Sequence, residues 1–299
     1  MKTRLVFCTT LLLLLSAFNT KKIKPKLPGE FVFIPGGTMH IDTGGNTQIH
    51  GERSMIVTLS SFYISKYEVS NLQYRQFYNE VSAALPEEDK EKIACDSTGW
   101  FNAPVGYNEP PNGKIYYKHP TFNNFPVVNI RQEGAVKYCE WLLQKIQKEN
   151  PGFDIEVKLP EKHQWIWAAM GGRSQAMYPW GNWYLRNNKG KPMCNFKRVE
   201  DYQVIKNRKT GLPEVHVQES SVSFFTSEVK SYYPNRYGLY NMCGNAAEMI
   251  SEKGICMGGS WDDYGGNVHT RAEATYDGPT PMVGFRPIFI ITEKKLPQQ

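Results

Sequence analysis

The sequence has no cysteine after Cys256, so its glycine-rich C-terminal segment, residues 258–286, carries no thiol. No two cysteines stand in a C-x-x-C or other metal-binding spacing, which argues against a zinc site built on cysteine. The motifs Gly-x-Ser-x-Gly and His-Glu-x-x-His are missing, and no glycine-rich phosphate loop follows a predicted strand. These absences exclude the hydrolase, zinc-protease and nucleotide-binding classes that depend on such motifs.

Charge of one sign is not concentrated in the chain either. The formal net charge is +6, and the one compact basic cluster is Lys21, Lys22, Lys24 and Lys26. This cluster follows an apolar run at residues 5–18, which Lys2 and Arg4 precede. That order is typical of a secretory signal peptide, and the run is short for a membrane span. We therefore expect no nucleic-acid binding.

We expect residues 1–20 to be a signal peptide or an uncleaved N-terminal anchor. The protein would then be exported to the periplasm or cell envelope, and it would meet a membrane only through this segment if uncleaved. After removal of residues 1–20, five cysteines remain: Cys95, Cys139, Cys194, Cys243 and Cys256. We expect buried thiols with at most one or two disulfides, because an odd number cannot pair completely within one chain.

What is present suits a folded domain. The 299 residues are 40% hydrophobic and 13% aromatic, which is enough to bury a large core. No internal repeat, low-complexity tract or linker divides residues 30–295. We predict one domain over residues 28–293 and a tail at residues 294–299.

Local patterns predict short strands and a few helices. Residues 30–41 are typical of a hairpin with its turn at Pro35-Gly36-Gly37, and residues 56–69 favour one or two strands. Helices are expected at residues 71–82, capped by Ser70, at 131–148, and from 159 to 170. Residues 84–125 are expected to form surface loops, and residues 125–128 a short strand. Residues 181–235 have weak periodicity and are expected to form a long excursion.

Several segments, in order, resemble one known family. They are residues 31–37; 67–71 with Tyr74 and Phe77; 126–128 with Ala135, Tyr138, Cys139 and Trp141; 159–161 with Trp165, Ala168 and Ala169; 171–172; 178–182; 238–242 with Gly244, Asn245 and Glu248; 258–261; and 284–286. The chain resembles the formylglycine-generating enzyme family, also called sulfatase-modifying factors. Each segment alone is a weak signal, and their order over roughly 260 residues makes the match specific.

The resemblance implies an α+β fold: a single compact C-type-lectin-like domain with little regular secondary structure. It also implies calcium, bound by a loop whose ligands carry over to Asn241, Gly244, Ala246 and Glu248. The loop departs from the family at Ala247, where tryptophan is usual. A second family site would begin at Asn195 and Phe196, with Ser221 at its acidic position, where the ligand is lacking.

Family enzymes oxidise a substrate cysteine to formylglycine with two cysteines of their own, which bind copper just after a Gly-Gly-Ser-aromatic motif. Here the motif is residues 258–261, and an ungapped count places Asp263 and Val268 at the two cysteine positions. A two-residue gap would place Thr270 at the second. Neither choice supplies a thiolate, so we expect no copper and no formylglycine-generating activity.

The same segment keeps polar and aromatic side chains that form a candidate ligand pocket, with a possible carboxylate–histidine metal site: Trp261, Asp262, Asp263, Tyr264, His269 and Arg271. The alternative is a surface loop whose polar residues hold turns. Arg286 is expected to need a buried carboxylate partner.

Three functions remain open. The first is a non-catalytic structural or binding component of the bacterial cell envelope with protein partners, like exported family members in gliding and type IX secretion machinery. Residues 67–81 resemble those proteins. The second is a periplasmic oxidase with a metal site free of cysteine, as in the pyoverdine-maturation branch. The third is a peptide- or glycan-binding module.

Overall fold

The N-terminal strands form one bent antiparallel ribbon. The structure is a computed structural model that describes residues 25–42, 54–102, 113–197, 202–217 and 225–293. Strands β1 (Phe31–Ile34) and β2 (Gly37–Asp42) pair with β4 (Phe62–Ser65) and β3 (Ser54–Leu59), respectively. The predicted hairpin at residues 30–41 is therefore wrong. Pro35 and Gly36 lie at a bend between two strands, and a Cβ on Gly36 would stand 2.6 Å from the Leu59 carbonyl oxygen.

Two four-stranded sheets organise the rest of the domain. The first has the order β1-β4-β12-β5 and is antiparallel, with β5 at Phe153–Lys158 and β12 at Ile288–Glu293. The second has the order β10-β9-β8-β11, and its β8–β11 pair is parallel. Its strands are β8 (Ala247–Met249), β9 (Ile255–Met257), β10 (Glu273–Thr275) and β11 (Val283–Gly284).

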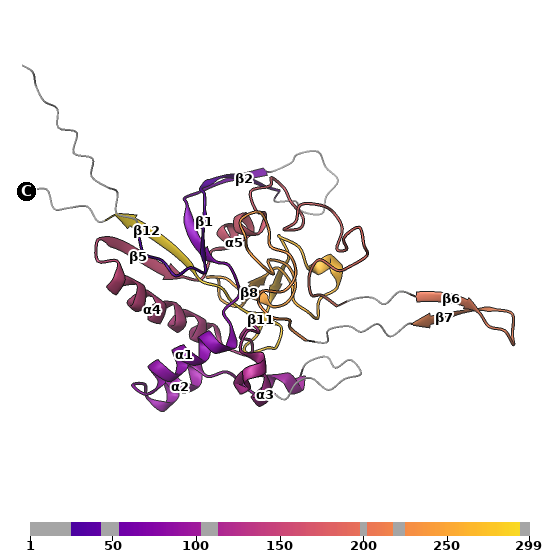
Figure 1. Cartoon of the computed structure of the whole chain (residues 1–299), viewed down its shortest axis with the longest axis horizontal. Coiled ribbons are helices and arrows are strands. Elements are labelled where there is room, and N and C mark those ends of the chain that lie inside the picture. The colour runs from indigo at the N-terminus through magenta and orange to yellow at the C-terminus, as the bar shows by residue number, and fades with distance from the viewer. Residues whose placement is uncertain (1–24, 43–53, 103–112, 198–201, 218–224, 294–299) are drawn as a thin grey trace, which may run out of the picture.

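Helices cover both faces of the first sheet. Helix α4 (Gln132–Glu149) runs beside β5 and β12 (Figure 1), and its Tyr138 packs in one core cluster with Phe289. Helix α5 (Lys162–Ala169) packs on the other face, where Trp165 and Ile288 share a second cluster. The neighbours Ile288 and Phe289 thus point to opposite faces, as alternation along a strand requires.

The helices are positioned by local sequence signals. Helix α1 (Asn71–Ser82) begins at a capping box in which Ser70 and Gln73 bond reciprocally. The predicted helices at residues 71–82 and 131–148 are confirmed, and the third spans a shorter stretch than predicted. Helix α5 is followed by Gly171 and Gly172, whose φ angles of 60° and 72° end it in the left-handed region.

Residues 84–102 and 113–125 are more ordered than their composition predicts. They contain α2 (Glu87–Ile93), η1 (Gly99–Asn102), α3 (Gly113–Lys118) and η2 (Pro120–Phe122). Trp100 and Tyr116 in this region are buried, and the Tyr116 hydroxyl lies 2.7 Å from Thr226 Oγ1. The prediction of surface loops is therefore wrong in part. The strand predicted at residues 125–128 is one isolated bridge between Ser70 and Pro126.

The excursion predicted at residues 181–235 contains a hairpin that projects from the body (Figure 1). Its strands are β6 (Tyr202–Lys206) and β7 (Pro213–Val217). The 3-10 helix η3 (Gly265–Asn267) lies in the C-terminal third, among the short strands expected there. None of the helices in the described ranges has the length and apolar character to cross a membrane. The predicted signal segment at residues 1–20, the tail at 294–299 and Ser221 lie outside the described residues.

Candidate functional site

The glycines after β9 hold the chain where side chains would collide. Gly258 and Gly259 have φ angles of 90° and 70°. A Cβ on Gly258 would lie 2.8 Å from the Trp165 ring, and one on Gly259 would lie 2.3 Å from the Asn267 carbonyl oxygen. Glycine is thus required at both positions. The following residues, 260–271, include η3.

Asp263, at the first predicted cysteine position, holds a turn. Its Oδ2 accepts hydrogen bonds from the Ser260 backbone N at 2.8 Å and from the Ser260 Oγ at 2.7 Å. The Asp263 carbonyl also accepts a hydrogen bond from the Lys197 backbone N, which joins this turn to another segment. This carboxylate therefore organises backbone groups of its own turn.

Val268, at the second position, is part of the core. Its side chain is fully buried in an apolar cluster with Cys194 and Phe196, against which Trp180 and Leu185 pack. Thr270, the other candidate for this position, is also fully buried, and its Oγ1 donates to the Ala176 carbonyl at 2.6 Å. Neither position presents a metal ligand of the soft type that cuprous ion requires.

The remaining candidate pocket residues make separate sets of contacts. Trp261 is buried and donates its Nε1 to the Pro281 carbonyl at 3.0 Å. Asp262 pairs with Lys197 at 2.9 Å, and that ammonium lies 5.4 Å from the ring centre of Tyr264, which is exposed. The structure thus separates the buried Trp261 from the surface set around Lys197.

His269 and Arg271 form another set. The His269 Nδ1 accepts a hydrogen bond from the Arg271 backbone N at 3.2 Å. Burial of the imidazole lowers the pKa of His269 below its ordinary value of 6.5, and the nearby Arg271 charge lowers it further. Among the described residues, no three His, Cys, Asp or Glu side chains group so as to hold a metal ion. The carboxylate–histidine metal site at residues 262–269 was one of two interpretations of the sequence, and it stays a prediction.

Arg286 and Glu248 form the buried pair expected from the sequence. Arg286 donates from Nε to Glu248 Oε2 at 2.6 Å and from Nη2 to Oε1. Its other donors reach the carbonyls of Ser65, Lys66 and Tyr240, so all five N–H groups of the guanidinium have partners. The prediction of a buried carboxylate partner for Arg286 is confirmed.

The predicted calcium loop contains oxygen donors of the required type. The Asn241 Oδ1 is buried and has no hydrogen-bond partner. Glu248 accepts three hydrogen bonds, two from Arg286 and one from Trp165 Nε1 at 2.7 Å, which leaves about one of its four lone-pair positions, on Oε1. The unpartnered Asn241 Oδ1 and the remaining position on Glu248 Oε1 are oxygen donors of the type that calcium takes.

Glu68 is buried and hydrogen-bonded to residues of the predicted calcium loop, and it was not among the predicted site residues. Its Oε1 accepts from Asn245 Nδ2 at 2.8 Å and its Oε2 from Asn241 Nδ2 at 3.1 Å. Burial raises the pKa of Glu68 to about 7. The positive charge of Arg286 acts to lower this pKa, and the negative charge of Glu248 acts to raise it. Asn195, at the predicted second site, joins this network through Asn245 Oδ1, and its own Oδ1 is without a partner. The sequence signal for Glu68 was a lone acid in the mainly apolar and aromatic stretch 62–69.

The five described cysteines are not linked by disulfides. Burial raises the pKa of Cys95 and Cys256 to about 12 and that of Cys243 well above its ordinary range. These thiols are therefore protonated at neutral pH and poor nucleophiles. The expectation of buried thiols is confirmed for four of the five described cysteines, and Cys95 is half-buried.

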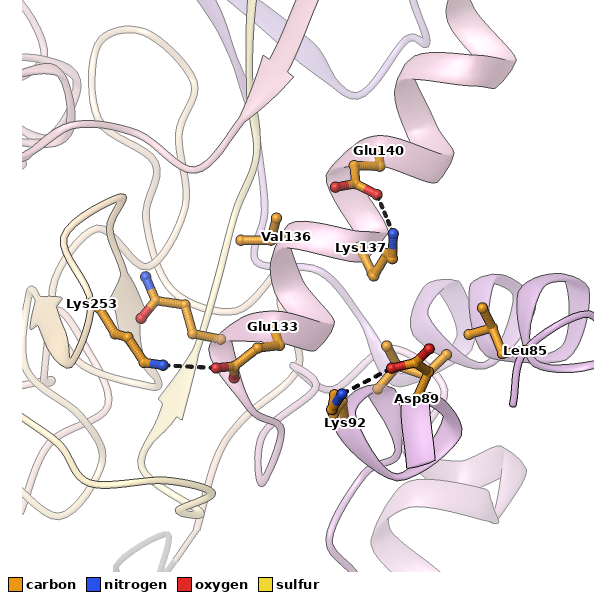
Figure 2. A pocket seen from close by; sticks show the side chains of 10 residues that line it. Leu85, Asp89, Lys92, Glu133, Val136, Lys137, Glu140 and Lys253 are labelled. Atoms are coloured by element: carbon orange, nitrogen blue, oxygen red, sulfur yellow. Dashed lines mark hydrogen bonds and ion pairs between the residues drawn. The ribbon is translucent and has the colours of Figure 1, made fainter. Parts of the chain in front are cut away.

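A groove of about 530 Å³ lies between α2 and α4, outside the segments discussed above (Figure 2). We call it the α2–α4 groove. Its lysines are neutralised by acids within the groove: Lys253 pairs with Glu133, Lys137 with Glu140 and Lys92 with Asp89, each at 2.7–2.9 Å. Leu85, Ile93 and Val136 supply its apolar surface.

The family model for the sulfatase-modifying factor enzyme 1-like domain matches residues 17–289. The chain belongs to this family. The formylglycine-generating enzyme of Bos taurus is 26% identical over 284 residues, which cover 87% of this chain but only 64% of that relative. The inactive C-alpha-formylglycine-generating enzyme 2 of Mus musculus is 23% identical over 296 residues, which cover 85% of this chain and 84% of that relative.

Among solved structures, PvdO from Pseudomonas aeruginosa superposes with a TM-score of 0.56 at 16% identity, covering 87% of this chain and 93% of that chain. This likeness supports the fold alone. The predicted family and the α+β fold with little regular secondary structure are thereby confirmed. The family's scaffold surrounds a segment in which Asp263 and Val268 occupy the predicted cysteine positions.

Proposed function

We propose that this protein is a member of the family without formylglycine-generating activity, and that it serves as a binding or structural component of the cell envelope. The observation that carries the first part is the pair of positions Asp263 and Val268. One side chain is tied to Ser260 and the other is buried in an apolar cluster. Neither can form the thiolate that copper-dependent oxidation requires.

Exposed aromatic side chains support the binding role. Trp183 and Tyr184 are 72% and 71% exposed, and Tyr264 is 53% exposed. Leu185 lies against Gly265, where an added Cβ would be 2.3 Å from Leu185 Cδ1. This contact brings residues 183–184 close to Tyr264 along the surface. Large exposed aromatics are enriched where proteins bind partners.

Export follows from residues 1–20, which we propose as a signal peptide or anchor ahead of a domain at 28–293 and a tail at 294–299. We propose protein partners in the envelope, no nucleic acid, and membrane contact only through an uncleaved N-terminal segment. Cross-linking in envelope fractions tests the binding role. A Trp183→Ser/Tyr184→Ser variant should lose partners that the wild type and a Leu212→Ser control retain. Identical cross-links in all three would contradict the proposal.

We also propose a structural calcium ion held by Asn241, Gly244, Ala246 and Glu248. The unpartnered Asn241 Oδ1 supports it, because calcium favours amide and carboxylate oxygens. A ligand that binds the native state raises its unfolding midpoint. Millimolar calcium should therefore raise the midpoint of thermal unfolding above that in chelator, whereas magnesium should do so less. An unchanged midpoint would contradict the calcium site.

The oxidase and the peptide- or glycan-binding module differ in what they require of residues 261–271. A cleft floored by Trp261 and Tyr264 would favour the module, but Trp261 is buried. Elemental analysis of the purified protein separates the oxidase from our proposal. We expect no stoichiometric iron or copper. A redox metal bound at one per chain, and lost in Asp263→Ala, would overturn the non-catalytic assignment.

A further inference from the structure

A second cavity, of about 180 Å³, lies where β2, the end of α5 and the segment after it meet. We call it the arginine cavity. The buried side chains of Met39 and Met170 line it, as does Trp167, which donates its Nε1 to the Pro35 carbonyl. Arg173 and Arg271 also line it. The two arginines are nearly 100 residues apart in sequence, so the fold brings them together.

Among the described residues, no acidic side chain neutralises the positive charge around this cavity. Its lining contains no aspartate or glutamate. Burial lowers the pKa of Arg173, and the nearby charge of a third arginine, Arg236, lowers it further. The Arg236 backbone packs against Gly171. Within the described residues, no carboxylate lies within 4.0 Å of the guanidinium nitrogens of these three arginines. In the α2–α4 groove, by contrast, the lysines have acidic partners.

Arg173 retains donors for a ligand. Its Nη1 donates to the Trp180 carbonyl, which fixes the guanidinium beside Gly181. The other N–H groups of this half-buried guanidinium make no hydrogen bond within the described residues. A partly buried, unpaired charge is unfavourable, and a bound anion would relieve it.

We propose that the arginine cavity binds a tetrahedral oxyanion group, the sulfate or phosphate of a monoester. A guanidinium presents paired N–H groups that match the oxygens of such a group, and two arginines line this cavity. The volume is below the roughly 300 Å³ of pockets that enclose whole drug-sized molecules, so the cavity suits one small group rather than its carrier. This inference stands apart from the proposed lack of oxidase activity and needs neither calcium nor the N-terminal segment.

The test is a titration of the full chain with inorganic phosphate, inorganic sulfate, glucose 6-phosphate and galactose 6-sulfate, followed by isothermal calorimetry. Ionic strength is held constant with sodium chloride, because exposed charges are screened by salt. The wild type should bind at least one of these anions saturably, at one per chain. Preference for the phosphate or the sulfate ester then identifies the source of the group.

Arg271→Gln and Arg236→Gln remove exposed arginines, and each should weaken binding by about tenfold or more. Arg208→Gln removes the same charge from the β6–β7 hairpin, away from the cavity, and should leave the affinity unchanged (Figure 1). Unfolding midpoints in chloride show that the variants are folded. Absence of saturable binding by the wild type, or equal affinity in Arg271→Gln and wild type, would overturn the proposal.

Discussion

Asp263 accepts two hydrogen bonds from Ser260, one from the backbone N at 2.8 Å and one from the hydroxyl at 2.7 Å. This closes the turn at the position where the family's first cysteine is predicted. The Asp263 carboxylate therefore stabilises the conformation of the turn at residues 260–263. A carboxylate used in this way is held in place by its neighbours.

Replacing Asp263 should measurably destabilise the fold. We expect Asp263→Ala to lower the free energy of unfolding by about 1–3 kcal/mol, because Ser260 loses its charged acceptor. Asp262→Ala breaks a partly exposed pair with Lys197, in which the Asp262 side chain is 17% exposed and that of Lys197 38%, and should cost about 1 kcal/mol. Urea unfolding of both variants measures the difference. Equal stability of Asp263→Ala and wild type would show that the turn does not depend on this carboxylate.

Val268 should tolerate no polar atom. Val268→Thr keeps the shape of the side chain but buries a hydroxyl in the cluster with Cys194 and Phe196, and we expect a cost of about 1–3 kcal/mol. Val136 on α4 is 44% exposed, so Val136→Thr is a matched control with little effect expected. Unfolding by urea compares the two. Similar losses at both positions would argue against an apolar core around Val268.

The buried ion pair should be strongly sensitive to loss of its cation. Arg286→Met leaves Glu248 buried without its main partner, and we expect a loss of about 3–5 kcal/mol. Lys253→Met breaks the exposed pair with Glu133 and should cost less than about 1 kcal/mol. Thermal and urea unfolding test both. A loss for Arg286→Met no larger than for Lys253→Met would contradict the described contacts.

His269 should remain neutral at a pH where an exposed histidine is half protonated. Its folded-state pKa lies below 6.5 because of burial and the Arg271 charge. The neutral imidazole therefore contributes fully to the free energy of unfolding above about pH 6.5, and this contribution is lost as the pH falls through the lower, folded-state pKa. An NMR titration of the imidazole, assigned with His269→Asn, measures this pKa. Arg271→Gln should raise it, and an unchanged value would exclude the arginine as a cause.

Local sequence signals predicted the parts of the fold that depend on neighbouring residues. The Ser70–Gln73 capping box and the apolar stripe with Ala135 and Tyr138 lie within single helices, so α1 and α4 could be predicted well. The Arg286–Glu248 pair could be anticipated because an arginine beside a core aromatic needs a carboxylate.

Contacts between distant segments could not be predicted in the same way. Strand β1 pairs with β4 rather than with β2, because Pro35 and Gly36 bend the ribbon instead of reversing it. Tyr116 is buried through its contact with Thr226, 110 residues away, in a region whose composition suggests loops. The arginine cavity joins Arg173 and Arg271 from segments that no local pattern connects.

The most direct test of the central claim is peptide oxidation. Purified protein is incubated with copper, oxygen and a peptide containing Cys-x-Pro-x-Arg, and aldehyde is measured by mass spectrometry after hydrazide capture. A catalytically active family enzyme serves as the positive control. Because Asp263 and Val268 supply no thiolate, we predict no aldehyde above a protein-free blank. Aldehyde formed by the wild type in repeated turnovers would contradict the account.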